Sequence, residues 1–135
     1  MKNLSPMKIS IFSFLLFFAV QTTVAQTVKK AKWEKQNKSI NGTFEIVKKE
    51  SGTYIVLSDD FKTKSAPDLK IFLSKKSLST ITGKNATKDA VLVSKLKNAK
   101  GGQSYKLSGS VKLSEYKSII IHCEEYGIFW GGSSL

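Results

Sequence analysis

The pattern that most constrains this chain is a series of short, β-rich segments that turn residues separate. Leu69, Ile71 and Leu73 alternate with Lys70 and Ser74, as in a strand that has one buried and one solvated face. Residues 53–57 and 116–123 are rich in β-branched and aromatic side chains, which favour strands. No segment has a clear helical period. Regularly spaced strands of this kind predict an all-β, antiparallel fold of two packed sheets, a β-sandwich or a barrel-like pair.

Further strands are expected at residues 44–46, 105–107 and 126–130, where apolar and polar residues alternate or aromatic residues cluster. Residues 91–96 fit either a helix or a strand, and their β-branched content favours the strand. Residues 74–88 are polar and contain Gly, Asn, Ser and Thr. We therefore expect the longest loop of the domain there.

The start of the chain has the three parts of a secretion signal. Two lysines precede an apolar run at residues 9–20, and the small residues Thr23 and Ala25 follow it. A retained membrane anchor is the alternative, but a spanning helix needs about 20 apolar residues and this run is shorter. We predict a signal peptide at residues 1–25, cleaved after Ala25. The mature protein is then exported, periplasmic or extracellular, and has no membrane span.

The rest of the chain divides into two parts. Residues 26–38 are rich in lysine and contain Trp33 but show no hydrophobic period, so we expect a weakly ordered N-terminal linker. Residues 39–135 form the predicted β-sandwich domain, which is long enough to fold on its own hydrophobic core.

The chain is strongly basic, with a formal net charge of +12, and every basic residue is a lysine. Sequence-specific recognition of nucleic acid relies on the planar arginine side chain, so specific nucleic-acid binding is not expected. The lysines are scattered, which fits a solvated surface. It also fits weak attraction to an anionic component of the cell surface.

Cys123 is the only cysteine, so no internal disulfide can form. Alternation along the strand places Ile119, Ile121 and Cys123 on one apolar face. His122 lies on the opposite face. Cys123 is therefore either a small buried packing residue or a candidate redox thiol. A redox role needs a thiolate, which the acidic residues 124–125 disfavour. Because a second cysteine is lacking, such a reaction also needs a partner molecule.

Several motifs together resemble those of the DM-thirteen domain family, also called the electron transfer DM domain. They are APDLKIFLS at residues 66–74, GQSYKL at 102–107, YKSIIIHC at 116–123 and FWGGSSL at 129–135. Their order and spacing are more specific than any one of them. The resemblance covers residues 41–135, which is nearly the whole predicted mature chain.

This resemblance implies a β-sandwich of the Greek-key or jelly-roll kind. It also implies a redox or electron-transfer role centred on the family's cysteine, which is Cys123 here, with an unidentified protein as redox partner. Two residues depart from the family pattern, since His122 and Ser133 stand where Trp and Ala are usual. His122 is therefore a possible modulator of the thiol. The alternative function is a non-enzymatic cell-surface binding or adhesion module, in which Cys123 only packs the core.

No cofactor is predicted. Covalent haem attachment needs the Cys-x-x-Cys-His motif, which the chain lacks. Noncovalent haem with Cys123 as one axial ligand stays open. Neighbouring residues of a regular strand face opposite ways, so His122 could not bind the same iron.

No metal site is predicted either. The chain lacks the Cys and His residues of a usual zinc site, and its aspartates do not follow an EF-hand loop. Asp68 precedes a strand and fits a turn residue that bonds local backbone N–H groups. No Ser-His-acid or phosphate-binding glycine-rich pattern is present, so a conventional enzyme is not expected. The aspartates considered as calcium ligands are Asp59, Asp60, Asp68 and Asp89.

Overall fold

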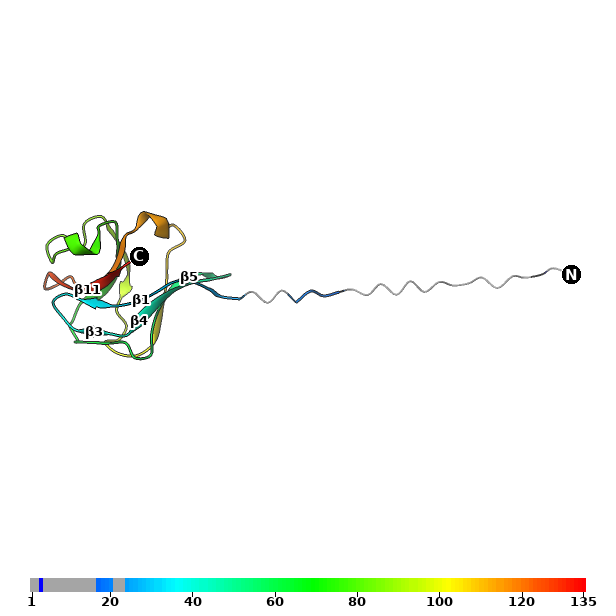
Figure 1. Ribbon diagram of the computed structural model, residues 1–135, viewed down its shortest axis with the longest axis horizontal. Coiled ribbons are helices and arrows are strands. Elements are labelled where there is room, and N and C mark those ends of the chain that lie inside the picture. Colours follow the sequence, from blue (N-terminus) through cyan, green and yellow to red (C-terminus); the bar gives the residue numbers. More distant parts are fainter. Residues whose placement is uncertain (1–2, 4–16, 21–23) are drawn as a thin grey trace.

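The computed structural model describes Asn3, residues 17–20 and residues 24–135. Most of the predicted signal peptide, residues 1–25, lies outside these described residues, so its cleavage stays a prediction. Within the described part of the chain, no helix is both long and apolar enough to cross a membrane. Figure 1 shows the strands gathered in one compact body, in which the C-terminus lies.

Strands form two large sheets and one small one, and every strand pair is antiparallel. The four-stranded sheet has the order β1 (Gln26–Lys32), β4 (Thr43–Lys49), β5 (Gly52–Leu57), β9 (Gln103–Lys106). The five-stranded sheet has the order β2 (Glu34–Lys35), β11 (Ile128–Ser134), β10 (Ser118–Cys123), β7 (Leu69–Ser74), β8 (Ala90–Lys95). The small sheet pairs β3 (Ile40–Asn41) with β6 (Lys62–Thr63), and two short 3₁₀ helices complete the fold, η1 (Leu78–Thr80) and η2 (Leu113–Glu115). The predicted all-β, antiparallel fold is confirmed.

Most of the core lies between the two large sheets. Phe44 of β4 and Ile55 of β5 are fully buried on one side of this layer, and Ile71 and Leu73 of β7 are fully buried on the other. Burying an aliphatic or aromatic side chain of this size stabilises a fold by about 1.5–3 kcal/mol. Because no disulfide is present in the described residues, this layer is the main source of stability.

A second, smaller core lies on the outer face of the five-stranded sheet. Residues 75–89 run across this face, and their apolar side chains pack against the sheet. The expected long loop is therefore a cover that includes η1, rather than an open loop. Its buried members and their sheet partners are Leu78, Ile81, Ala86, Phe72, Ile120 and Phe129.

The expectation of a weakly ordered linker at residues 26–38 is wrong. β1 pairs with β4 along nearly its whole length, and β2 pairs with β11. Between them Trp33 is only 6% exposed and packs on Phe44, with ring centroids 4.9 Å apart. An edge strand pairs through its backbone and needs no apolar period. The lysine-rich sequence of β1 therefore gives no sign of a strand.

Two further expectations concern strand limits. The ambiguous segment at residues 91–96 is a strand, β8, as its β-branched content predicts. The last strand begins at Ile128 instead of residue 126 and continues to Ser134. A turn precedes it, in which the N–H of Gly127 donates to the carbonyl of Glu124 and Gly127 has a φ of 62°. That left-handed conformation favours glycine and shifts the start of the strand.

Candidate functional site

The candidate site lies at the end of β10, the strand that carries Cys123. All six residues of β10 are buried, and the strand pairs with β7 on one side and β11 on the other. At its end, Cys123 lies opposite Leu69 of β7 and Ile128 of β11. A strand in the middle of a sheet is held by hydrogen bonds along both edges, so β10 keeps Cys123 between β7 and β11.

Cys123 points into the layer between the sheets. Its side chain is 0% exposed and belongs to the same apolar cluster as Ile119 and Ile121, as alternation predicts. The thiol is free rather than bonded to another sulfur. A buried thiol in aliphatic surroundings behaves as a small apolar side chain, because reagents and the thiolate form both need contact with a polar medium. Any reaction of Cys123 therefore requires the surrounding structure to open.

His122 points to the opposite face of the sheet, beside Phe72. It is 2% exposed, and the edge of its ring approaches Phe72 with centroids 6.3 Å apart. Burial lowers the pKa of His122, and the nearby Glu124 carboxylate opposes this shift only in part. The imidazole is therefore neutral at pH 7. Its Nδ1 has no hydrogen-bond partner among the described residues.

Cys123 and His122 thus do not form one site. They are neighbours in the chain, but the sheet separates their side chains, as alternation along a strand requires. A direct hydrogen bond from the imidazole to the thiol, of the kind that activates catalytic cysteines, is ruled out in this geometry. Any influence of His122 on the thiol is indirect, through the position of the shared strand.

Charged residues hold the turn that follows Cys123. Lys70 Nζ lies 2.6 Å from Glu124 Oε2 and 3.4 Å from Asp68 Oδ1. The hydrogen bond that Lys70 donates to Glu124 is the main cause of the raised pKa of Lys70. The N–H of Glu125 donates to Asp68 Oδ2 at 3.0 Å, so Asp68 bonds a distant part of the chain instead of its own turn. These contacts close the end of β10 and could not be found from local sequence.

The Gln-x-Tyr element of the family-like motif holds the loop between β8 and β9. Gln103 Nε2 donates to the carbonyls of Asn98 and Gly101, and Gln103 Oε1 accepts the N–H of Asn98. The hydroxyl of Tyr105 accepts the N–H of Lys97 at 2.8 Å. Burial raises the pKa of Tyr105, so this hydroxyl stays protonated at neutral pH. Both motif residues therefore organise a loop instead of lining a site.

The aspartates considered as calcium ligands do not assemble. Asp60 accepts a hydrogen bond from Ser58, Asp68 binds Lys70, and Asp89 Oδ2 lies 2.7 Å from Lys76 Nζ. Across residues 24–135, no group of three or more Cys, His, Asp or Glu side chains is placed to hold a metal ion.

The fold and the buried cysteine together define an antiparallel β-sandwich domain with one thiol on a central strand. The chain matches the family described as "Electron transfer DM13" over residues 32–135, and it belongs to this family. This match confirms the family that the motifs resemble. No curated protein and no solved structure matches the chain.

Proposed function

We propose that this protein is an exported electron-transfer module in which Cys123 is the redox residue. The family match over residues 32–135 is the observation that carries the proposal, since the family is described by electron transfer. Cys123 is the only thiol of the chain, so it is the only residue able to take part in thiol exchange. Neither an additional enzyme activity nor a bound cofactor is needed.

The proposed reaction is an exchange with a disulfide of a partner protein. Cys123 loses its proton to solvent, and the resulting thiolate attacks one sulfur of the partner disulfide. A mixed disulfide forms, and the partner's other sulfur leaves as a thiolate. Because this chain has no second cysteine, a dithiol of a second partner protein must supply the two electrons. One thiol of that protein attacks the Cys123 sulfur and releases the first partner as a dithiol. The other thiol then releases Cys123 and closes a disulfide in the second partner.

Burial of the sulfur means that the reaction needs a local opening. Cys123 is the last residue of β10, and the next three residues, 124–126, are exposed. The turn that contains them is closed by the Lys70–Glu124 ion pair and by the bond from Glu125 to Asp68. Separation of this turn is a smaller event than unfolding of the sandwich, and turns of this kind belong to the less stable parts of a fold.

The rate of alkylation of Cys123 by iodoacetamide, measured at increasing urea below the unfolding transition, tests this requirement. Local opening exposes little surface, so the rate should depend weakly on urea. Global unfolding exposes the whole core, and the rate would then follow the full urea dependence of unfolding. The second result would end the proposed role for Cys123 and favour the alternative below.

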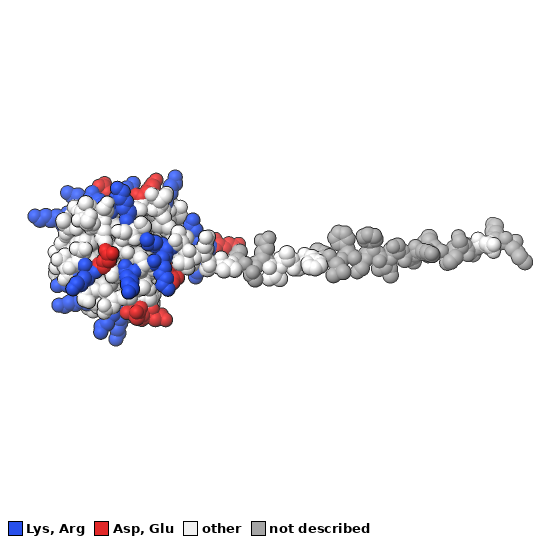
Figure 2. All heavy atoms as spheres, in the orientation of Figure 1, with Lys and Arg blue, Asp and Glu red and all other residues white. Residues whose placement is uncertain are grey.

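The alternative is a non-enzymatic binding module in which Cys123 only packs the core. The specific observation in its favour is that Cys123 is 0% exposed within an aliphatic cluster. The visible surface in Figure 2 carries many lysines with carboxylates between them, which suits weak contact with anionic cell-surface components. This alternative predicts that a Cys123→Ala variant keeps all its binding to anionic surfaces.

Export is part of the proposal and has its own test. The intact mass of the mature protein recovered from the producing cells should correspond to a chain that begins at Gln26. Recovery of the protein with its apolar N-terminal run still attached would contradict cleavage after Ala25.

A further inference from the structure

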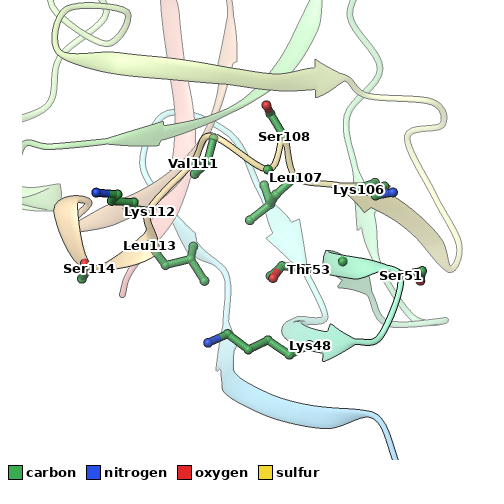
Figure 3. Close-up of a pocket in the computed structure, with 12 residues that line it drawn as sticks. Lys48, Ser51, Thr53, Lys106, Leu107, Ser108, Val111, Lys112, Leu113 and Ser114 are labelled. Atoms are coloured by element: carbon green, nitrogen blue, oxygen red, sulfur yellow. The ribbon is translucent and has the colours of Figure 1, made fainter. Parts of the chain in front are cut away.

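A basic groove lies at one end of the four-stranded sheet, and Cys123 is not among its lining residues. It is formed where the β4–β5 hairpin meets the segment that leads from β9 into η2 (Figure 3). Its volume is about 530 Å³. Cavities that bind small molecules are typically about 300–1,000 Å³, so the groove is large enough for one or two sugar rings.

The floor of the groove is apolar. Leu107 is 5% exposed, and Val111 and Leu113 are half-buried, so the three side chains offer a hydrophobic surface that water still reaches. Figure 3 shows Leu107, Val111 and Leu113 along the segment that borders the groove. A surface of this kind suits the apolar face of a sugar ring, which packs on it while the ring's hydroxyl groups stay polar.

The rim of the groove is positively charged. Lys48 from β4, Lys106 from β9 and Lys112 before η2 all line it, and no carboxylate lies among its lining residues. In Figure 3 Lys106 and Lys112 lie on opposite sides of the groove, and Lys48 extends towards Leu113. The salt bridges of the described residues use other lysines, Lys30, Lys70 and Lys76. Three lysines that take no part in these salt bridges therefore line one hollow.

Hydroxyl groups complete the lining. Ser51 and Thr53 from the β4–β5 hairpin and Ser108 and Ser114 from the facing segment all border the groove. Each hydroxyl can both donate and accept, which matches the mixed donors and acceptors of a sugar. Gly52 brings the hairpin close, because a Cβ there would lie 2.9 Å from Lys106 Cε. A side chain at this position would push Lys106 away from the rim.

We infer that this groove binds a saccharide unit that carries an anionic group, either a carboxylate or a phosphate. The apolar floor would contact the ring, the hydroxyl side chains would bond its hydroxyl groups, and the lysines would attract its charge. Lysine is a compact point charge that serves carboxylate and phosphate alike. The site does not involve Cys123, so a test of saccharide binding is independent of the electron-transfer proposal.

Titration of the ¹⁵N-labelled protein, followed by NMR, tests this inference with three probes at constant ionic strength. A uronic-acid oligosaccharide and a sugar phosphate are the two anionic probes, and a neutral oligosaccharide is the control. We expect saturable shifts at residues 51–53 and 106–114 with at least one anionic probe, and none with the neutral one. The anionic probe that binds identifies the charged group. Absence of shifts with both anionic probes, or shifts spread over all lysines, would overturn the inference.

A matched pair of variants separates a site from general charge attraction. Lys48→Gln with Lys112→Gln removes two charges from the rim, and Lys62→Gln with Lys64→Gln removes two exposed charges elsewhere. Exposed charge pairs are individually weak, so the loss of two of them should weaken binding by the rim variant about two- to thirtyfold. The second variant should keep the original affinity. Equal weakening in both would show that only net charge matters.

Discussion

Lys70 Nζ lies 2.6 Å from Glu124 Oε2, which joins the first half of β7 to the turn that follows Cys123. The same ammonium group lies 3.4 Å from Asp68 Oδ1, so two acids of different segments share one cation. Cys123 precedes Glu124 directly. The ion pair therefore fixes the turn at the end of the strand that carries the thiol.

The first prediction concerns this ion pair. Lys70→Met should lower the free energy of unfolding only slightly, because solvent screens a partly exposed ion pair. It should nevertheless speed alkylation of Cys123 severalfold, because it weakens the turn whose opening exposes the thiol. Iodoacetamide labelling followed by mass spectrometry measures this rate.

Lys76→Met is the matched control for Lys70→Met. Lys76 forms a 2.7 Å pair with Asp89 and is about as exposed as Lys70, at 26% against 23%. Its loss should leave the labelling rate of Cys123 unchanged. If both variants change the rate by the same factor, the Lys70–Glu124 pair has no special connection with the thiol.

The second prediction is a loss of stability in mild acid. Burial lowers the pKa of His122 in the folded state, whereas an unfolded chain has a histidine pKa of about 6.5. Below that pH the unfolded state binds a proton that the folded state does not, so the free energy of unfolding falls as pH decreases. The slope can reach about 1.4 kcal/mol per pH unit. Urea unfolding at pH 7.5, 6.5 and 5.5 measures it.

His122 is the only histidine of the chain, so a His122→Phe variant isolates its contribution. Phenylalanine keeps an aromatic ring beside Phe72 and cannot bind a proton. The slope between pH 7.5 and 5.5 should largely disappear in this variant. An unchanged slope would mean that other groups cause the acid sensitivity.

The third prediction concerns the packing of Cys123. Cys123→Ser places a hydroxyl in the apolar layer, where an unpaired polar group costs about 1–3 kcal/mol. Cys123→Ala only removes the sulfur and should cost less. Urea unfolding of the two variants should therefore rank serine as the more damaging substitution. If serine is tolerated as well as alanine, the sulfur is not enclosed as the structure shows.

The fourth prediction concerns the contact between the cover and the β10–β11 turn. A Cβ at Gly83 would lie 2.0 Å from the carbonyl oxygen of Gly127, so Gly83→Ala forces the backbone apart. Overpacking of this kind typically costs about 1–3 kcal/mol. At Gly109 a Cβ would meet nothing within 4 Å, and Gly109→Ala should be nearly neutral. Thermal unfolding compares the two, and equal melting temperatures would contradict this close approach.

Much of the fold follows from the sequence because alternation reports which face of a strand is buried. Leu69, Ile71 and Leu73 face the inner layer as expected, and Cys123 shares a face with Ile119 and Ile121. The other face of β7 was expected to be solvated, but it is covered, since Phe72 and Ser74 are buried too. Sequence could not decide whether that face was closed, since two facing sheets and the ends of neighbouring strands determine the exposure of the sulfur.

The features that sequence missed depend on contacts between distant residues. β1 is an edge strand held by backbone bonds to β4, so its lysines carry no hydrophobic signal. Trp33 was the available signal, because a large aromatic residue in a polar segment often marks an anchor. The pair of Lys70 with Glu124 spans 54 residues of chain, and no local pattern contains it.

The cover at residues 75–89 has a consequence for the integrity of the domain. It shields Phe72, Ile120 and Phe129, which belong to three adjacent strands of the five-stranded sheet. A single protease cut within residues 82–85 would release the cover. It would expose a continuous apolar surface on the outer face of the five-stranded sheet. Bare sheet faces of this kind associate with one another. A cleaved protein would therefore aggregate while the core between its two large sheets is still folded.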